Sequence, residues 1–457
     1  MHRVSLPSGG GRGGIARLRQ LTGVVAVEAE RARRVAFDPG RASQTHLPQI
    51  GWAPPVGVRR PLVAVLDTGV DPTVPDLARS LVPGAARSFV ARSPDADDDP
   101  DGHGTHVASV IAGGIDNRLG GSGVADARVI SVRIADRRGV ATTTSIVRGL
   151  RYARRRGARV INLSLGGAGR SALEQRAVGE AVRAGAVVVA AAGNTGRQGL
   201  QYPAAYRGVL GVGALDLDGS SLPSSTRGPH VALAAPGREV RGAVRSVDAL
   251  PPGTLLGRSG TSVAAAIVSG AAARVLARRP RATPTQVRGL LMDTASDVGP
   301  AGADPATGAG ALDLAAALRT ALPPRADPEP NDTPSQARKR RALLTRSGPT
   351  ATMAGRVGGT ADPRDGFRVA LRAGERLEVV LRGPGDAAMN LALLRPGAPD
   401  GPRDAAFRRR SVAGTVVGPA ADKDAVLTTT ESGVHVLEVH GRSGAGRYRL
   451  SVRRLPA

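Results

Sequence analysis

Four short apolar runs between residues 62 and 191 constrain the fold of this chain most strongly. They are Leu62–Leu66, Arg128–Val132, Arg159–Ser164 and Ala186–Ala191. Helix-like stretches near Thr143–Arg156 and Ser171–Ala184 separate the last three runs. Continuous apolar strands that alternate with helices are typical of a parallel sheet covered on both faces. We therefore predict an α/β domain over residues 61–320.

The sequence changes character after Pro323-Pro324. The acidic, proline-rich run Asp327–Thr333 predicts a linker over residues 321–335. Beyond it, short runs of alternating polarity are separated by Gly and Pro turns, which predicts an all-β sandwich over residues 336–457. These runs are Gly366–Leu371, Arg376–Leu381, Asn390–Leu394, Gly433–Val439 and Tyr448–Val452. Upstream, residues 41–60 are turn-rich and predict another linker, and Val24–Glu28 in the first 40 residues predicts a short strand.

Composition excludes several classes of protein. The chain has no cysteine, which excludes a disulfide scaffold, a thiolate zinc site and a cysteine nucleophile. No apolar run approaches the roughly 20 residues of a membrane-spanning helix. The net charge of +25 is typical of nucleic-acid binding. However, all basic residues except Lys339 and Lys423 are arginines, dispersed and without interleaved aromatic residues, which favours a biased coding composition and no nucleic-acid partner.

Three glycine-framed polar clusters follow one another in the order Asp, His, Ser. Asp67 comes directly after the first apolar run, where an open α/β sheet binds its ligands. His103 opens an Ala/Val/Ile-rich helix, and Ser262 opens a long helix whose N-terminal dipole favours developing negative charge. Taken singly, Asp67 is explained equally well as a turn or capping residue and Ser262 as a helix N-cap. His106, three residues after His103, is expected to be a structural histidine.

Taken together, the three clusters indicate nucleophilic catalysis. A serine hydroxyl is a poor nucleophile until an imidazole accepts its proton, and a carboxylate then orients that imidazole and stabilises its cation. The order Asp67, His103, Ser262 argues against an α/β-hydrolase, in which the serine comes first.

These motifs resemble those of the subtilisin-like serine proteases, the subtilase family. The matching stretches are Val65–Val70, Gly102–Ala108, Val160–Gly167, Ala191–Asn194 and Gly260–Ala264. The resemblance implies that Asp67, His103 and Ser262 form the charge relay and that the Asn194 amide stabilises the oxyanion. It implies no cofactor for catalysis.

The same resemblance assigns the substrate-binding segments. Ser164, Leu165 and Gly166, with Ala192 and Gly193, would pair with the substrate backbone and form the walls of the pocket for P1, the residue before the scissile bond. Because these residues are small and uncharged, we expect an apolar or aromatic P1. Two positions depart from the family pattern: Val263 replaces the usual methionine, and Ala266 replaces a proline whose loss would alter the backbone near Ser262.

Two further features leave alternatives open. An acidic run, Asp95–Asp101, precedes His103; it is either a solvated loop or an acidic rim that favours basic residues at P2 or raises the pKa of His103. The His103/His106 pair lacks the spacing and the third ligand of a zinc site, so we expect no catalytic metal. A family calcium site is a separate possibility, with Asp76 and Asn117 as side-chain ligands and backbone oxygens from residues 115–121.

The flanking segments resemble known companions of subtilases. Leu18–Ala32 is similar to the end of an inhibitory propeptide that assists folding, and residues 336–457 are similar to the bacterial pre-peptidase C-terminal domain. We therefore expect a secreted, monomeric endopeptidase that acts on proteins or peptides, although no signal peptide is legible at Met1. Two rival hypotheses remain: an inactive subtilase fold that binds peptides, and a basic protein that binds polyanions.

Overall fold

The computed structural model describes residues 17, 20–22, 38–57, 59–90, 98–245, 250–251, 254–300, 302–323, 334–338, 342–344, 349–358, 364–383, 388–400, 412–416, 423–443 and 445–455. The chain divides into two compact units, residues 1–37 and 38–457. The strand expected at Val24–Glu28 lies outside the described residues, so the propeptide resemblance stays a prediction.

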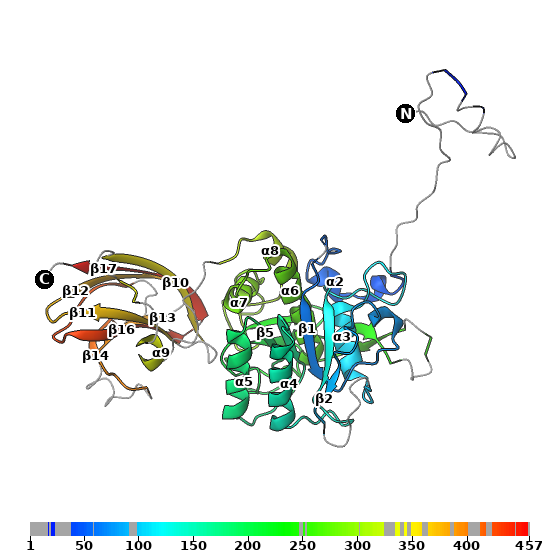
Figure 1. The fold of residues 1–457 in the computed structure, drawn as a ribbon, viewed down its shortest axis with the longest axis horizontal. Helices are drawn as coiled ribbons and strands as arrows, with labels where there is room; N and C mark the ends of the chain where they lie inside the picture. The colour runs from blue at the N-terminus through cyan, green and yellow to red at the C-terminus, as the bar shows by residue number, and fades with distance from the viewer. Residues whose placement is uncertain are drawn as a thin grey trace. The chain divides into compact units, whose positions relative to one another are not determined.

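A seven-stranded parallel sheet forms the first large part of the second unit (Figure 1), in the order β2-β3-β1-β4-β5-β6-β7. The strands are β1 (Leu62–Asp67), β2 (Arg87–Ser88), β3 (Arg128–Arg133), β4 (Val160–Leu163), β5 (Val187–Ala191), β6 (Val209–Leu215) and β7 (Leu233–Pro236). All four runs expected to form buried strands are present, as β1, β3, β4 and β5. The α/β prediction is confirmed.

Helices cover both faces of this sheet. They are α3 (His103–Ala112), α4 (Thr143–Arg155), α5 (Ala172–Arg183), α6 (Thr261–Arg278), α7 (Pro284–Asp293) and α8 (Leu314–Arg319). Side chains alternate between the faces along each strand. Val63 and Val65 of β1 therefore pack in the core with α3 and α6, whereas Ala64 and Leu66 pack in the core with α4 and α5. Two further strands, β8 (Val240–Ala243) and β9 (Leu255–Arg258), pair antiparallel, and β9 leads into α6.

The long helix α6 runs through the interior of this part. Among the described residues, it is the one helix whose length and hydropathy would let it cross a membrane, and 83% of that stretch is buried inside the protein. Its Ala/Val/Ile composition is therefore that of a core helix. Ala266, which replaces the family's proline, is fully buried, and the helix continues through it to Arg278.

The segment expected to be a linker over residues 41–60 is in part integral to the core. It contains the 3₁₀ turn η1 (Arg41–Ser43) and the short helix α2 (His46–Gln49). Leu47 and Ile50 pack in the same hydrophobic cluster as α3 and α6. Its proline- and glycine-rich composition concealed this role, because a few buried apolar residues suffice to anchor an irregular segment.

The C-terminal part is a pair of four-stranded antiparallel sheets. One has the order β10-β17-β12-β15 and the other β11-β16-β13-β14. A short helix, α9 (Pro334–Arg338), precedes them; the strands are β10 (Thr350–Gly358), β11 (Arg364–Leu371), β12 (Arg376–Arg382), β13 (Ala388–Leu394), β14 (Val412–Val416), β15 (Lys423–Thr428), β16 (Gly433–Ser443) and β17 (Ala445–Leu455). Alternate residues, such as Leu377, Val379 and Leu381 of β12, form the core between them. The predicted all-β part is confirmed.

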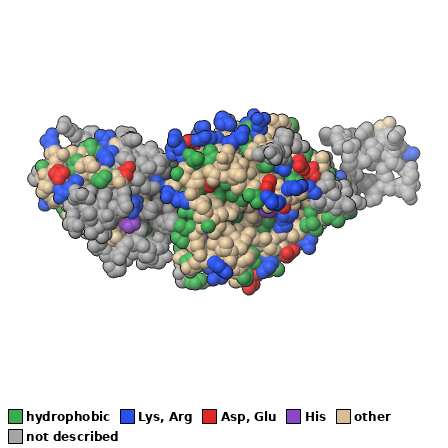
Figure 2. Space-filling view, turned by 90° about the horizontal axis from the view of Figure 1, so that it is seen from below, with side chains coloured by type: hydrophobic (Ala, Val, Ile, Leu, Met, Phe, Trp, Pro, Cys, Tyr) green, Lys and Arg blue, Asp and Glu red, His purple; other side chains and the backbone are tan. Residues whose placement is uncertain are grey.

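On the face that Figure 2 shows, the basic residues lie in separate areas. Figure 2 shows the Lys and Arg side chains in several groups on one face, with broad neutral surface between them. This distribution agrees with the dispersed arginines of the sequence and differs from the continuous basic stripe typical of a nucleic-acid-binding face.

Candidate active site

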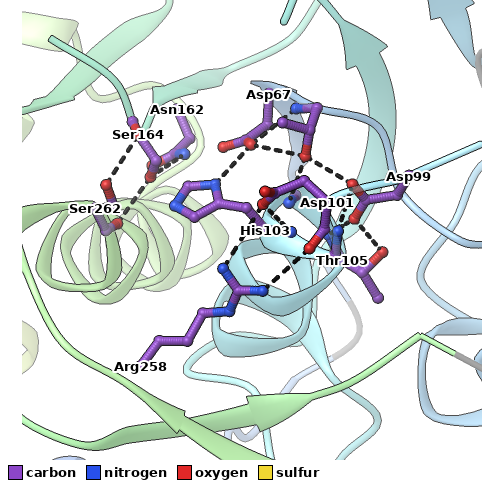
Figure 3. A network of polar contacts seen from close by, with 12 residues as sticks. Asp67, Asp99, Asp101, His103, Thr105, Asn162, Ser164, Arg258 and Ser262 are labelled. Carbon is purple, nitrogen blue, oxygen red and sulfur yellow. Dashed lines mark hydrogen bonds and ion pairs between the residues drawn. The ribbon is translucent and has the colours of Figure 1, made fainter. Parts of the chain in front are cut away.

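Asp67 and His103 form the centre of the site. Asp67 is the last residue of β1 and His103 the first of α3, and His103 Nδ1 lies 2.7 Å from Asp67 Oδ1. Because an ionised carboxylate only accepts hydrogen bonds, Nδ1 carries the proton and donates it to Asp67. The neutral ring then has its lone pair on Nε2. In Figure 3 the ring lies between Asp67 and Ser262, as a general base for that serine requires.

Two glycines allow these elements to approach closely enough. Gly69 has φ +129, and a Cβ there would lie 2.1 Å from the carbonyl oxygen of Asp98. A Cβ on Gly104 would lie 1.9 Å from the carbonyl oxygen of Gly69. The glycine framing of the Asp and His motifs therefore has a packing cause: the end of β1, the segment around Asp98 and the start of α3 meet backbone to backbone.

The environment of His103 favours its protonated form. Burial lowers the pKa of the imidazole. The negative charge of Asp67, its hydrogen bond to the ring and the charge of Asp101 raise the pKa, and together they outweigh the effect of burial. The net result is a His103 pKa above its ordinary value. Arg258 opposes the shift through its positive charge. A carboxylate that stabilises the imidazolium is the function expected of the acid in a charge relay.

Ser262 lies in the first turn of α6. The backbone N–H groups of a first helical turn have no acceptor within the helix, so the Ser262 N–H is available to a ligand. Ser262 Oγ donates a hydrogen bond to the Ser164 carbonyl at 3.0 Å, and Ser164 Oγ donates to the Ser262 carbonyl at 2.8 Å. The serine is therefore held against the segment after β4, and its hydroxyl must turn from Ser164 to reach His103. Such catalytic hydrogen bonds often form only with substrate present.

Asn194 lies near the same helix end, and none of the described residues hydrogen-bonds to its NH₂ group. Its Oδ1 accepts hydrogen bonds from the backbone N–H and the hydroxyl of Thr261, at 2.9 and 3.0 Å. Thr261 Oγ1 also accepts a bond from the Gly193 N–H at 3.1 Å. A backbone N–H can only donate, so the atom facing Thr261 must be Oδ1, and among the described residues Nδ2 has no hydrogen-bond partner. The sequence analysis did not assign this orienting role to Thr261.

The segments expected to form the P1 pocket lie around Ser262, joined by a residue that the motifs did not indicate. A Cβ on Gly166 would lie 3.8 Å from Gln201 Cβ, and one on Gly193 would lie 2.8 Å from Gln201 Cγ. The half-buried Gln201 side chain thus touches both walls. No described residue hydrogen-bonds to its amide. Gln201 belongs to no motif, and only its placement reveals it.

His106 is a structural residue, as expected. It is 1% exposed, and its Nε2 lies 3.1 Å from the Leu256 carbonyl. Burial lowers its pKa to about 4, so the ring is neutral near pH 7.

Comparison with known proteins identifies the family. A model of the subtilase family matches residues 59–310. The chain belongs to the subtilase family. It is 40% identical over 238 residues to the thermostable alkaline protease of Halalkalibacterium halodurans, a match that covers 52% of this chain and 62% of that relative. It is 38% identical over 242 residues to subtilisin DY of Bacillus licheniformis, covering 52% of this chain and 84% of the relative.

One further relative is matched over a smaller share of its length, and one solved structure has a similar fold. The cell wall-associated protease of Bacillus subtilis is 37% identical over 238 residues, which is 26% of its length. The crystal structure of a lanthipeptide protease matches with a TM-score of 0.50 and 25% identity, covering 57% of this chain and 87% of that chain. These subtilase matches cover about half of this chain.

In the described part of the acidic run before His103, Asp98 and Asp99 have partners within the protein, whereas Asp101 raises the pKa of His103, as one of the two alternatives expected. Asp95 and Asp97 lie outside the described residues. Asp98 Oδ2 lies 3.1 Å from Arg133 Nη1. The buried Asp99 accepts hydrogen bonds from Thr68 and Thr105, which tie the end of β1 to the start of α3. Burial raises the pKa of Asp99. Asp101 remains partly exposed.

Subtilases often bind structural calcium, and Asp38 shows how the corresponding loop is held here. The Asp38 carboxylate accepts bonds from the backbone N–H groups of residues 116–118, at 3.0, 2.9 and 3.2 Å. Ser122 Oγ donates to it at 2.6 Å and Arg41 Nη2 at 2.8 Å. The Arg41 guanidinium also pairs with Asp116. The loop therefore points its N–H groups at an anion of the protein itself.

The calcium ligands expected from the sequence do not fit this loop. Asn117 Oδ1 accepts the Leu119 N–H at 2.8 Å, which fixes the orientation of the amide. Asn117 therefore turns its NH₂ group to Asp76 Oδ1, 2.8 Å away, and an NH₂ group cannot bind a cation. Burial raises the pKa of Asp76 to about 6. Among the described residues, no three His, Asp or Glu side chains converge as a metal site.

Proposed function

We propose that this subtilase is a serine endopeptidase that hydrolyses peptide bonds through an acyl intermediate on Ser262. The observation that carries the proposal is the 2.7 Å contact of Asp67 with His103, with the ring directed between Asp67 and Ser262. The Asn194 NH₂ group and the Ser262 N–H, neither of which has a partner in the described part of the chain, add two oxyanion donors at the same helix end. Serine, base, orienting carboxylate and oxyanion donors are the parts that acyl transfer requires.

Four residues carry out the proposed reaction, and His103 acts in turn as base and acid. Ser262 Oγ attacks the carbonyl carbon as His103 Nε2 takes its proton, and Asp67 stabilises the resulting imidazolium. Asn194 Nδ2 and the Ser262 N–H bind the oxyanion. The C–N bond then breaks as His103 returns that proton to the leaving amine. Water, activated by His103, attacks the acyl carbon, and Ser262 recovers its proton as the acid product leaves.

We propose an apolar or aromatic P1 residue whose far end meets Gln201. Ser164, Leu165, Gly166, Ala192 and Gly193 bring no charge to the pocket. The Gln201 amide, lacking a partner in the described part of the chain, would accept or donate a hydrogen bond to a P1 side chain with a polar tip. We therefore expect aromatic P1 residues with a hydroxyl, and methionine, to be cleaved better than purely aliphatic ones.

The proposal includes the flanking segments. We propose that residues before Asp38 act as an inhibitory propeptide, and that any maturation cut precedes Asp38 because its carboxylate holds the 116–118 loop. We propose that the protein is exported from the cell and that its C-terminal part is a pre-peptidase-like domain. Both proposals rest on the resemblance of the sequence to secreted peptidases. The protein would act as a monomer on protein or peptide substrates.

Hydrolysis of unfolded casein by the wild type, Ser262→Ala and Ser259→Ala tests the proposal. Ser259 lies three residues away, and its hydroxyl pairs with Glu239 rather than with the relay, so it is the matched control. We expect activity in the wild type and in Ser259→Ala, and its loss in Ser262→Ala. A folded wild type without activity would favour the rival hypothesis of an inactive peptide-binding subtilase.

A further inference from the structure

Arg258, the last residue of β9, lies beside the general base. Its Nη2 donates to the Asp101 carbonyl at 3.2 Å, and its Nη1 lies 3.7 Å from Asp101 Oδ1. The positive charge of Arg258 also acts on His103. Figure 3 shows the guanidinium next to the His103–Asp101 segment. The sequence analysis did not indicate this residue, because β9 lies outside every catalytic motif.

The charge of Arg258 is only partly compensated. Its side chain is 40% exposed, and its contact with the Asp101 carboxylate is longer than a hydrogen bond. The Asp101 carboxylate also accepts the His103 backbone N–H at 3.1 Å. Of the other described acids in this run, Asp98 pairs with Arg133 and Asp99 is buried in hydrogen bonds. A substrate carboxylate near Arg258 would therefore meet a cation whose one ion pair among the described residues is the 3.7 Å contact with Asp101.

The position of Arg258 determines which half of a substrate it faces. Ser164 and Arg258 lie on opposite sides of the Ser262–His103 pair in Figure 3. In the proposed reaction the acyl half lies along residues 164–166, and His103 passes its proton to the leaving amine. The residues that follow the scissile bond therefore extend toward the side on which Arg258 lies.

We propose that Arg258 is a specificity-determining residue that selects an acidic side chain directly after the scissile bond. The inference rests on the proposed function, since it uses the direction in which a cleaved peptide would lie. Substrates with Asp or Glu at this position, P1′, should be preferred over those with Lys or Arg. Exposed ion pairs are weak, so we expect a preference of roughly three- to tenfold that declines as salt is added.

The experiment compares three peptides that differ only at P1′, with Glu, Gln or Lys. We expect kcat/KM of the wild type to fall in that order. Arg258→Gln should remove the difference between Glu and Lys, and Arg258→Glu should reverse it. Arg151→Gln is the matched control, because Arg151 is 43% exposed, lies 3.6 Å from Glu180 and belongs to α4. Asp101→Asn keeps an acceptor for the His103 N–H but removes the negative charge that faces Arg258. This variant should therefore show a larger preference for Glu over Lys at P1′.

Two further measurements keep this inference separate from the proposed function. Binding of the uncut peptides to Ser262→Ala measures the same order of preference without chemistry, and Arg258→Gln in that background should abolish it. Arg258→Gln should also move the acidic limb of kcat/KM to higher pH, because its charge lowers the pKa of His103. Equal binding and equal cleavage of the Glu and Lys peptides would overturn the inference. Loss of cleavage with the binding order intact would overturn only the proposed function.

Discussion

Thr261 fixes the orientation of the Asn194 side chain. The Thr261 backbone N–H and hydroxyl both donate to Asn194 Oδ1, at 2.9 and 3.0 Å. The amide can satisfy these two donors only with its oxygen, so its NH₂ group is directed elsewhere before any substrate binds. An oxyanion donor that is already oriented needs no reorganisation during the reaction.

Asn194→Ala should therefore lower kcat by roughly 10²–10³ and leave KM almost unchanged, because the lost hydrogen bond forms mainly in the transition state. Steady-state kinetics on a soluble peptide measures both constants. Thr261→Ser, which retains both donors to Oδ1, should remain close to the wild type. An Asn194→Ala enzyme that keeps more than half of the wild-type kcat would contradict the assigned role.

Gln201 should control P1 selectivity. Gln201→Gly deepens the pocket between Gly166 and Gly193, so the ratio of kcat/KM for Phe over Ala at P1 should rise roughly tenfold or more. Gln201→Glu, of the same shape but charged, should instead favour Lys or Arg. Profiling with a P1-varied peptide library measures both changes. Identical P1 profiles for all three enzymes would show that Gln201 does not reach the substrate.

The 116–122 loop should be stable without calcium. Thermal unfolding of Ser262→Ala, which avoids autolysis, should give the same Tm in EDTA and in calcium chloride. Arg41→Gln should lower stability by about 2 kcal/mol, because it removes hydrogen bonds between charged groups and Asp38. A calcium-dependent rise in Tm that Asp76→Asn abolishes would mean that the loop rearranges to bind the metal.

Acid should destabilise the protein through two buried histidines. His46 is buried, and neither of its ring nitrogens bonds to any residue that the structure describes. Burial lowers the pKa of His46 to about 3 and that of His106 to about 4. The unfolded state, with histidine pKa values near 6.5, binds more protons between pH 6.5 and 4. The free energy of unfolding is therefore highest above pH 6.5, and each histidine removes about 1.4 kcal/mol per pH unit as the pH falls through that window.

Urea unfolding of Ser262→Ala at pH 7 and pH 5 measures this loss of stability. His46→Leu in the same background should reduce the loss and leave stability at pH 7 similar. A pH dependence that is unaltered by His46→Leu would assign the acid sensitivity to other groups.

The sequence predicted the elements whose signal is local. Asp67 follows an apolar run, and Ser262 starts an apolar helix. Neighbouring residues therefore indicated where the strand ends, where the helix begins and which side chains stand there. The glycines beside them were also informative, because only a close backbone approach, as at Gly69 and Gly104, requires them.

Long-range placement determined the rest. Thr261, Gln201 and Arg258 acquire their roles from Asn194, Gly166 and Asp101, each more than 30 residues away in the chain, which no local pattern encodes. The family resemblance suggested calcium bound by Asp76, Asn117 and backbone oxygens of residues 115–121, yet the orientation of the Asn117 amide depends on the Leu119 N–H. The turn-rich composition before residue 60 likewise concealed the buried Leu47 and Ile50.

Labelling with a fluorophosphonate probe, followed by peptide mapping, tests the central claim most directly. The probe reacts only with a serine whose proton a neighbouring base removes. The account predicts a single labelled peptide containing Ser262 in the wild type, reduced labelling in His103→Ala and none in Ser262→Ala. A folded wild type, freed of residues 1–37, that remains unlabelled at Ser262 would contradict it.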